Sequence, residues 1–199
     1  MRRILGVAVA VALFGATGAF AVDLSIGADI PLGMTYWNHP DLDESINGFL
    51  YGGEVVLNAM FTPQFAGEFK IGLVFDSWTD DVAEWDYRDR YFNLVGLFKF
   101  YVNPTVFVGA GLEYSRFATS HIEDSFGNEV DVDRSDLEDA GVDEDIDPLF
   151  ILAAAGVDLV VSPTLIVPLA VNVAYGILNI PDDVTRMHIY GTIGIRYLL

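Results

Sequence analysis

The stretch "TIGIRYLL", residues 192–199, finishes the chain on an alternating pattern of side chains. One side of this segment, if it is extended, carries the apolar residues Ile193, Ile195, Tyr197 and Leu199. The opposite side carries the polar residues Thr192 and Arg196. Alternation with a period of two predicts a β-strand that has one apolar face. The pattern starts near Met187, so we expect the last strand to span 187–199.

The same alternation occurs seven more times, and no convincing helical periodicity follows residue 21. Val55 and Leu57, for example, share one face of a predicted strand, and Glu54 and Asn58 share the other. The eight predicted strands span about 24–37, 49–61, 68–78, 91–102, 105–118, 149–161, 165–178 and 187–199. The sequence therefore predicts an all-β fold.

The connections between these strands alternate in length. Short connections at 62–67, 103–104 and 162–164 contain proline with asparagine, serine or threonine, which suits tight turns. The longer polar connections span about 38–48, 79–90, 119–148 and 179–186. A regular succession of short and long connections predicts an antiparallel up-and-down meander, with short turns at one end and elaborated loops at the other.

The two faces of the strands predict what surrounds the sheet. The more polar face carries mostly Gly, Ala, Ser and Asn with about one charge per strand, too few charges for a surface in water. The other face is almost continuous Val, Ile, Leu, Phe and Tyr, which suits hydrocarbon. Each stretch reaches the ~9–11 residues that a tilted transmembrane strand needs. Because only a closed barrel pairs every backbone group in lipid, we predict an eight-stranded transmembrane β-barrel.

Aromatic residues fall near both ends of the predicted strands. Tyr36, Trp37, Tyr51, Trp78, Tyr91, Tyr114 and Tyr175 lie toward the long loops, and Phe61, Phe100, Tyr101 and Tyr197 lie toward the short turns. Two aromatic girdles at the membrane interfaces would explain this distribution. The simpler alternative is that aromatic residues favour strands in general.

The N-terminus predicts export from the cytoplasm. Arg2 and Arg3 form a basic start, residues 4–18 are apolar or small, and Ala19-Phe20-Ala21 forms a cleavage signal. These features are typical of a secretory signal peptide over residues 1–21, which leaves a single barrel domain over 22–199. The chain has no cysteine, so disulfides and thiolate metal sites are excluded. A signal peptide followed by a barrel predicts the outer membrane as the location.

The charge balance is strongly acidic. The chain holds 29 acidic and 10 basic residues, for a net charge of −19. Removing Arg2 and Arg3 leaves 8 basic residues against 29, or −21. A polyanion of this kind is not expected to bind nucleic acid.

Much of the acidity lies in segment 119–148, which holds 12 acidic residues. Asp131-x-Asp133-x-Ser135 begins like a calcium-binding EF-hand loop. However, Asp136 and Val142 stand where that loop needs glycine and glutamate. Two alternatives stay open for the segment: a solvated acidic loop, or a looser site for divalent cations.

The barrel interior is the main candidate site. Eight strands leave an interior that side chains can fill. The charged residues assigned to it are Glu54, Lys70, Lys99, Glu113, Asp158 and Arg196. Charges that leave water need partners, so we expect a neutralising ion network that plugs the barrel. The alternative use of the same charges is a gated ion path.

The whole predicted domain resembles the small outer-membrane barrels of the OmpA, OmpX and OmpW type. Members of that group end in a strand that the barrel-assembly machinery recognises. Its pattern is matched here by Thr192, Gly194, Tyr197 and Leu199, although the last residue is usually Phe. The resemblance implies a monomer that interacts with outer-membrane lipid and with the assembly machinery, without a cofactor or a catalytic metal.

Three functions follow from this resemblance. The first is a non-enzymatic envelope protein that interacts through its acidic outer loops. The second is OmpW-like passage of small solutes or hydrophobic molecules, which the charged interior disfavours. The third is a lipid A-modifying enzyme, for which the candidate groups are His39 with Asp76-Ser77 and His121 with Ser120 and Glu123. Neither set matches a family motif closely, so we expect no enzymatic activity.

Overall fold

The computed structural model describes residues 23–39, 44–80, 85–139, 147–178 and 185–199. The predicted signal peptide, 1–21, lies outside these residues. The described elements are β1 (Asp23–His39), β2 (Glu44–Thr62), β3 (Phe65–Asp80), β4 (Trp85–Tyr101), β5 (Val106–Asp124), β6 (Glu129–Asp133), α2 (Arg134–Asp139), β7 (Leu149–Ser162), β8 (Leu165–Leu178) and β9 (Thr185–Leu198). None of the described residues belongs to a helix long and apolar enough to cross a membrane.

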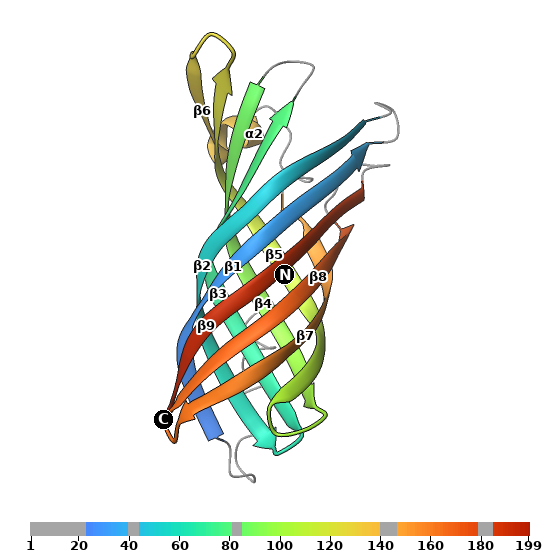
Figure 1. The fold of residues 1–199 in the computed structure, drawn as a ribbon. Helices are drawn as coiled ribbons and strands as arrows, with labels where there is room; N and C mark the ends of the chain where they lie inside the picture. The colour runs from blue at the N-terminus through green and yellow to red at the C-terminus, as the bar shows by residue number, and fades with distance from the viewer. Residues whose placement is uncertain (1–22, 40–43, 81–84, 140–146, 179–184) are drawn as a thin grey trace.

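Eight of the strands close into an antiparallel barrel (Figure 1). Each barrel strand pairs with the barrel strand that follows it in the chain. β4 pairs with β5, and β5 pairs with β7, because β6 lies outside the barrel wall. The barrel is sealed between the first and last strands, whose register runs from Ser25↔Leu198 to Asn38↔Thr185. The predicted eight-stranded up-and-down barrel is therefore confirmed, and the segment 187–199 is the strand that closes it.

The strand ends differ from the prediction mainly at the long-loop end of the barrel. β2 begins at Glu44, β4 begins at Trp85 and β5 continues to Asp124, so each extends several residues beyond its predicted bound. The predicted loop 119–148 also contains β6, which pairs with the outer part of β5. These extensions mix isolated apolar residues such as Trp85 and Ile122 with many polar ones, so neither face carries the continuous apolar series that marks the other strand segments.

The β5–β6 hairpin is held by a tight turn at its tip. The Asp124 carboxylate accepts hydrogen bonds from the backbone N–H groups of Phe126 and Asn128, at 2.9 and 2.8 Å. The side chain of Asn128 donates a third hydrogen bond, which is the main reason that the pKa of Asp124 is lowered. Gly127 adopts a positive φ of 78°, a conformation that glycine takes without strain.

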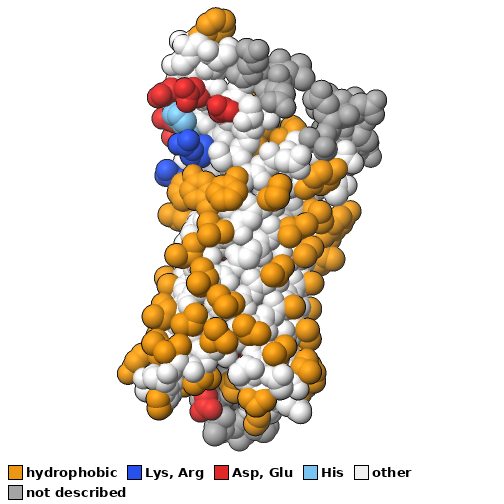
Figure 2. Space-filling view, viewed as in Figure 1, with side chains coloured by type: hydrophobic (Ala, Val, Ile, Leu, Met, Phe, Trp, Pro, Cys, Tyr) orange, Lys and Arg blue, Asp and Glu red, His pale blue; other side chains and the backbone are white. Residues whose placement is uncertain are grey.

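The outside of the barrel is apolar and the inside is polar. On β2, Val55 is 55% exposed, whereas its neighbours Glu54 and Val56 are 4% and 0% exposed. Figure 2 shows apolar side chains over most of the wall. They include Ile26, Ile30, Leu32, Met34, Phe69, Ile71, Phe92, Phe98, Val108, Leu112, Ile151, Val171, Val173, Ile189, Ile193 and Ile195. This apolar belt is the reverse of a water-soluble barrel, so hydrocarbon is the solvent that it suits.

The aromatic residues only partly follow the predicted girdles. Rings of Phe49, Tyr51 and Phe75 stack on the outer wall toward the long loops, with centroid distances of 5.8 and 5.2 Å. Tyr91 and Tyr101, however, are buried in the interior at 5% and 2% exposure. Their positions in β4 have the inward parity of the strand, which decides their direction more strongly than their distance from the interface.

We expect the cost of a charge on the belt to depend on its depth. Leu112 lies near the middle of the belt, opposite Gly96, and Val102 lies at the short-turn edge. Leu112→Arg should lower the free energy of unfolding in lipid vesicles by about 2–4 kcal/mol, and Val102→Arg by about 0–1 kcal/mol. Urea titrations of the refolded variants measure both values. Equal costs at the two positions would contradict a bilayer around this belt.

Candidate functional site

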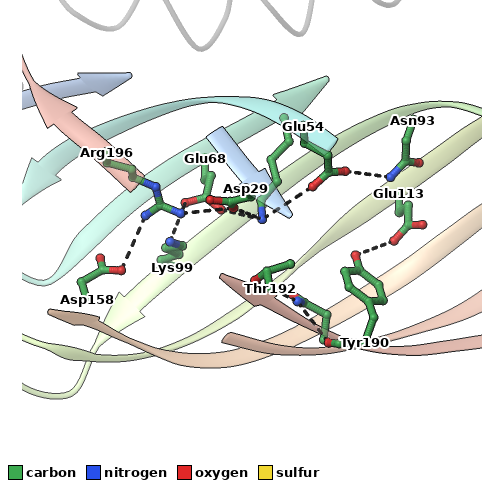
Figure 3. Close-up of polar contacts among 12 residues, drawn as sticks. Asp29, Glu54, Glu68, Asn93, Lys99, Glu113, Asp158, Tyr190, Thr192 and Arg196 are labelled. Atoms are coloured by element: carbon green, nitrogen blue, oxygen red, sulfur yellow. Dashed lines mark hydrogen bonds and ion pairs between the residues drawn. The ribbon is translucent and has the colours of Figure 1, made fainter. Parts of the chain in front are cut away.

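The barrel interior gathers all six charged residues that the sequence assigned to it. Glu54, Lys70, Lys99, Glu113, Asp158 and Arg196 are each at most 6% exposed. Period-two alternation turns them inward, because each occupies the face opposite the apolar belt. Figure 3 shows most of these side chains pointing toward one another from several strands.

Glu68 on β3 is the centre of the network near the short turns. Its carboxylate forms ion pairs with Lys99, with Arg196 at 2.6 Å and with Lys70 at 3.3 Å. Arg196 belongs to β9, and two strands, β1 and β2, separate it from β3 around the wall. The Arg196–Glu68 bond therefore crosses the interior (Figure 3).

Asp29 on β1 joins the same group. Lys70 Nζ donates a hydrogen bond to Asp29 Oδ2 at 2.7 Å, and Arg196 lies 3.6 Å from that oxygen. Gly194 on β9 makes room for this carboxylate, since a Cβ at that position would lie 1.9 Å from Asp29 Oδ1. A glycine is thus required where β9 passes the buried acid.

Asp158 on β7 closes the network toward the short turns. The hydroxyl of Tyr101 donates to Asp158 Oδ2 at 2.6 Å, and Arg196 Nη1 lies 3.6 Å from Oδ1. One strand, β5, stands between the tyrosine on β4 and the acid on β7. The contact therefore also spans the interior and not only a pair of neighbouring strands.

Polar contacts continue toward the long loops. Asn93 donates to Glu54 at 3.0 Å and accepts a hydrogen bond from Ser115 at 3.0 Å. Glu113 on β5 accepts a hydrogen bond from the hydroxyl of Tyr190 at 2.8 Å, and His188 Nδ1 lies 3.2 Å from it. Tyr190 and His188 lie on β9, so this group again connects opposite walls of the barrel.

Arg186 on β9 connects to β3 at the end of the interior nearest the long loops. Its guanidinium contacts Asp76 on β3 at 3.1 Å. The rings of Trp37 and Tyr91 lie 4.1 and 4.9 Å from its Cζ atom, and Phe150 lies at 5.8 Å. Ion pair and cation–π contacts together hold this cation in a site from which water is largely excluded.

The interior holds more acid than the six predicted residues suggest. The additional buried members include Asp29, Glu68, Asp76, Asp89, Arg186 and His188. Most of them occur at inward positions of the alternating pattern, which is the signal that identifies them. Among the described residues, seven buried carboxyl groups of the barrel strands accompany four buried lysines and arginines. The charges are shared within one network, in which Glu68 pairs with three cations and Arg196 with three acids.

The four residues of the predicted assembly signal lie on both faces of β9. Thr192 is buried beside Asn172, whose side chain donates to it at 3.4 Å, and Gly194 lies against Asp29. Tyr197 and Leu199 are exposed on the outer wall. Recognition of this strand by an assembly machinery stays a prediction.

The residue sets considered for catalysis are separated by the strand geometry. Ser120 is buried, whereas the ring of His121 reaches the outer face of the β5–β6 hairpin and contacts Asp131 at 2.8 Å. Neighbouring residues on a strand point to opposite faces, so Ser120 cannot lie against the His121 ring. Asp76 is turned inward to Arg186, and the side chain of His39 lies outside the described residues.

A second polar group lies on the outer face of the β5–β6 hairpin. The cross-strand pairs His121↔Asp131 and Glu123↔Glu129 occupy one face of it. Ligand atoms of His121, Glu123 and Glu129 all lie within 4.8 Å of one another. A divalent cation site, one of the two alternatives left open for the acidic segment, would have these oxygen and nitrogen ligands within the described residues.

Comparisons with known proteins agree with the fold. No protein-family model matches the chain, and no curated protein matches it. The crystal structure of Neisserial surface protein A is similar, with a TM-score of 0.52 and 12% sequence identity over 90% of this chain and 99% of that chain. The fold is therefore that of the small outer-membrane barrels, which agrees with the apolar belt and with the expected location in the outer membrane.

Two further structures align over similar lengths. Ail of Yersinia pestis, crystallised with the heparin analogue sucrose octasulfate, has a TM-score of 0.44 and 15% identity over 89% of this chain and 97% of its own. OprG of Pseudomonas aeruginosa has a TM-score of 0.47 and 11% identity over 92% of this chain and 98% of its own. Neither similarity carries functional information for this chain.

Removal of the central carboxylate should destabilise the barrel. Glu68→Gln keeps the size of the side chain but leaves Lys70, Lys99 and Arg196 without their shared counter-charge. Breaking a buried ion pair on one side costs about 3–5 kcal/mol. The exposed hairpin variant Glu123→Gln should change the free energy of unfolding by less than about 0.5 kcal/mol. Urea titrations in lipid vesicles compare the two variants, and equal stabilities would contradict an energetic role for the network.

Divalent cation binding at the hairpin can be tested by calorimetry of the refolded barrel. Zinc or calcium should release or absorb heat at concentrations up to about 1 mM, and the signal should vanish in His121→Ala. His39→Ala is the matched control, because it removes a histidine from a different part of the chain. No heat with either ion, or an unchanged signal in His121→Ala, would exclude this site.

Proposed function

We propose that this closed eight-stranded barrel is an integral outer-membrane protein with a plugged interior, which presents an acidic surface on the loop side of the membrane. The proposal rests on the polar bridges from β9 across the interior. Arg196 and Arg186 reach Glu68 and Asp76 on β3 at two levels. Tyr190 reaches Glu113 on β5 between them. Side chains that meet from opposite walls at successive levels leave little room for a continuous aqueous path.

The acidic surface gives such a barrel its interaction role. Glu123, Glu129, Asp131 and Asp133 are on the hairpin that β5 and β6 extend beyond the apolar belt. A rigid two-stranded ribbon holds these carboxylates outward more firmly than an irregular loop would. Partners that suit this surface are cationic, either metal ions or basic groups of a neighbouring molecule.

A transport function is the second candidate, but its requirements fit the interior poorly. Passage of a hydrophobic molecule needs an apolar path, whereas the barrel strands carry seven buried carboxyl groups among the described residues. Each of these groups would lose its partners if the solute displaced them, at a cost of several kcal/mol. An enzymatic role lacks an assembled nucleophile and base among the described residues.

Planar bilayer recordings test the plugged interior. The refolded protein should insert, as shown by heat-modifiable migration on gels, without producing steady current steps. The physical reason is that ions must break the Arg196–Glu68 and Arg186–Asp76 bridges to pass. A large and stable conductance from the inserted, folded protein would contradict the proposal and favour the channel function.

A further inference from the structure

The few cations of this acidic chain are distributed in an uneven way. Eight lysines and arginines follow residue 21. Lys70, Lys99, Arg186 and Arg196 are buried in the barrel, and Arg134 pairs with Asp147 at 2.6 Å. The three that are left, Arg88, Arg90 and Arg116, are all exposed.

These three arginines form one cluster on the outer wall. Arg88 and Arg90 alternate along β4 on its outward face, opposite His121 and Thr119 of β5. Arg116 lies on β5 opposite Phe92, which is the next outward residue after Arg90. The arginine cluster, Arg88, Arg90 and Arg116, is thus a patch of neighbouring outward positions on two paired strands.

The height of the arginine cluster matches the edge of the apolar belt. Phe92 is 53% exposed and is the last apolar residue on this face of β4 before Arg90. The outward-facing residues of β5 become more polar toward the long loops, from Leu112 through Tyr114 to Arg116. Figure 2 shows cationic side chains directly above apolar ones, with a histidine and acidic side chains beyond them. In a bilayer this height is the headgroup level.

The arginine cluster makes no ion pair with the described residues. Within the part of the chain that the structure describes, no carboxylate lies within 4.0 Å of Arg88, Arg90 or Arg116. Arg90 instead lies over the ring of Phe75, with its Cζ atom 5.4 Å from the centroid. Arg88 and Arg90 share a depression with two carboxylates of β6; its lining residues are Phe75, Arg88, Arg90, Thr119, His121, Asp131 and Asp133.

We propose that the arginine cluster binds the phosphate group of an anionic lipid in the leaflet on the long-loop side of the barrel. Guanidinium groups match phosphate oxygens in a bidentate geometry, and the lipid is the anion that stands at this height beside Phe92. The acyl chains would lie on the apolar belt below, and the carboxylates of Asp131 and Asp133 would repel a phosphate that moved farther out. This inference rests on the membrane location given under the proposed function.

A lipid titration on the refolded, micelle-inserted barrel tests the proposal. The probe is a phosphate-bearing lipid, compared with the same lipid carrying a neutral headgroup, and native mass spectrometry reports the bound fraction. An arginine near a charged membrane surface contributes a factor of about five in affinity. The triple variant R88Q/R90Q/R116Q should therefore bind the phosphate-bearing lipid on the order of 100-fold more weakly, with the neutral lipid unaffected.

Two control variants separate a phosphate site from net charge. R88K/R90K/R116K keeps the three charges but loses the bidentate geometry, so an intermediate affinity is expected. E123Q/E129Q/D139N raises the net charge by three at acidic residues that do not line the depression. Its gain in affinity should be much smaller than the loss in the glutamine variant. Equal and opposite effects of these charge changes would overturn a specific site.

The remaining outcomes distinguish the two proposals. A barrel that folds and inserts but binds both lipids equally, or that is unaffected by R88Q/R90Q/R116Q, overturns the lipid site and leaves the proposed function intact. Full competition by inorganic phosphate at equal concentration would also overturn it, because the acyl chains would then contribute nothing. A protein that never enters micelles or bilayers contradicts the proposed function itself.

Discussion

Backbone pairing in the absence of water is the constraint on which the rest of this structure depends. A strand in hydrocarbon can satisfy its N–H and C=O groups only with two neighbouring strands, so the sheet must close. β1 and β9 provide that closure over the register from Ser25↔Leu198 to Asn38↔Thr185. The closing strand also brings Arg186, His188, Tyr190 and Arg196 into the interior, so the same segment seals the wall and supplies its polar filling.

Closure turns the usual arrangement of a globular protein inside out. Large apolar residues such as Ile30 and Leu112 are half exposed, while Glu68, Lys99 and Arg196 are almost fully buried. A buried charge is tolerated only when its partners are in place, and the narrow interior makes this possible because side chains from opposite walls reach one another. Small residues are needed where a strand passes such a group, as Gly194 does beside Asp29. The charge network and the shape of the backbone are therefore mutually dependent.

Charge is sorted along the barrel axis as well as between its two faces. The belt carries apolar side chains, the arginine cluster follows at its loop-side edge, and the carboxylates of the β5–β6 hairpin lie beyond. Each zone matches a different layer of a membrane: hydrocarbon, anionic headgroups and water. This order explains how a chain with a net charge of −19 can still interact favourably with anionic lipid, because its few exposed cations are placed where the headgroups are.

The sequence by itself determined the eight barrel strands and which face of each meets lipid, because the period of two is a local property that every barrel strand repeats. It also placed Glu54, Lys70, Lys99, Glu113, Asp158 and Arg196 inside, since parity along a strand follows from position alone. Which inward side chains meet was decided only by the tertiary structure, because the Arg196–Glu68 and Tyr190–Glu113 contacts depend on the stagger and closure of eight strands. The β5–β6 hairpin and the arginine cluster were also decided by the tertiary structure. Their residues lack a clear apolar alternation or lie far apart in the sequence, so only strand pairing brings them together.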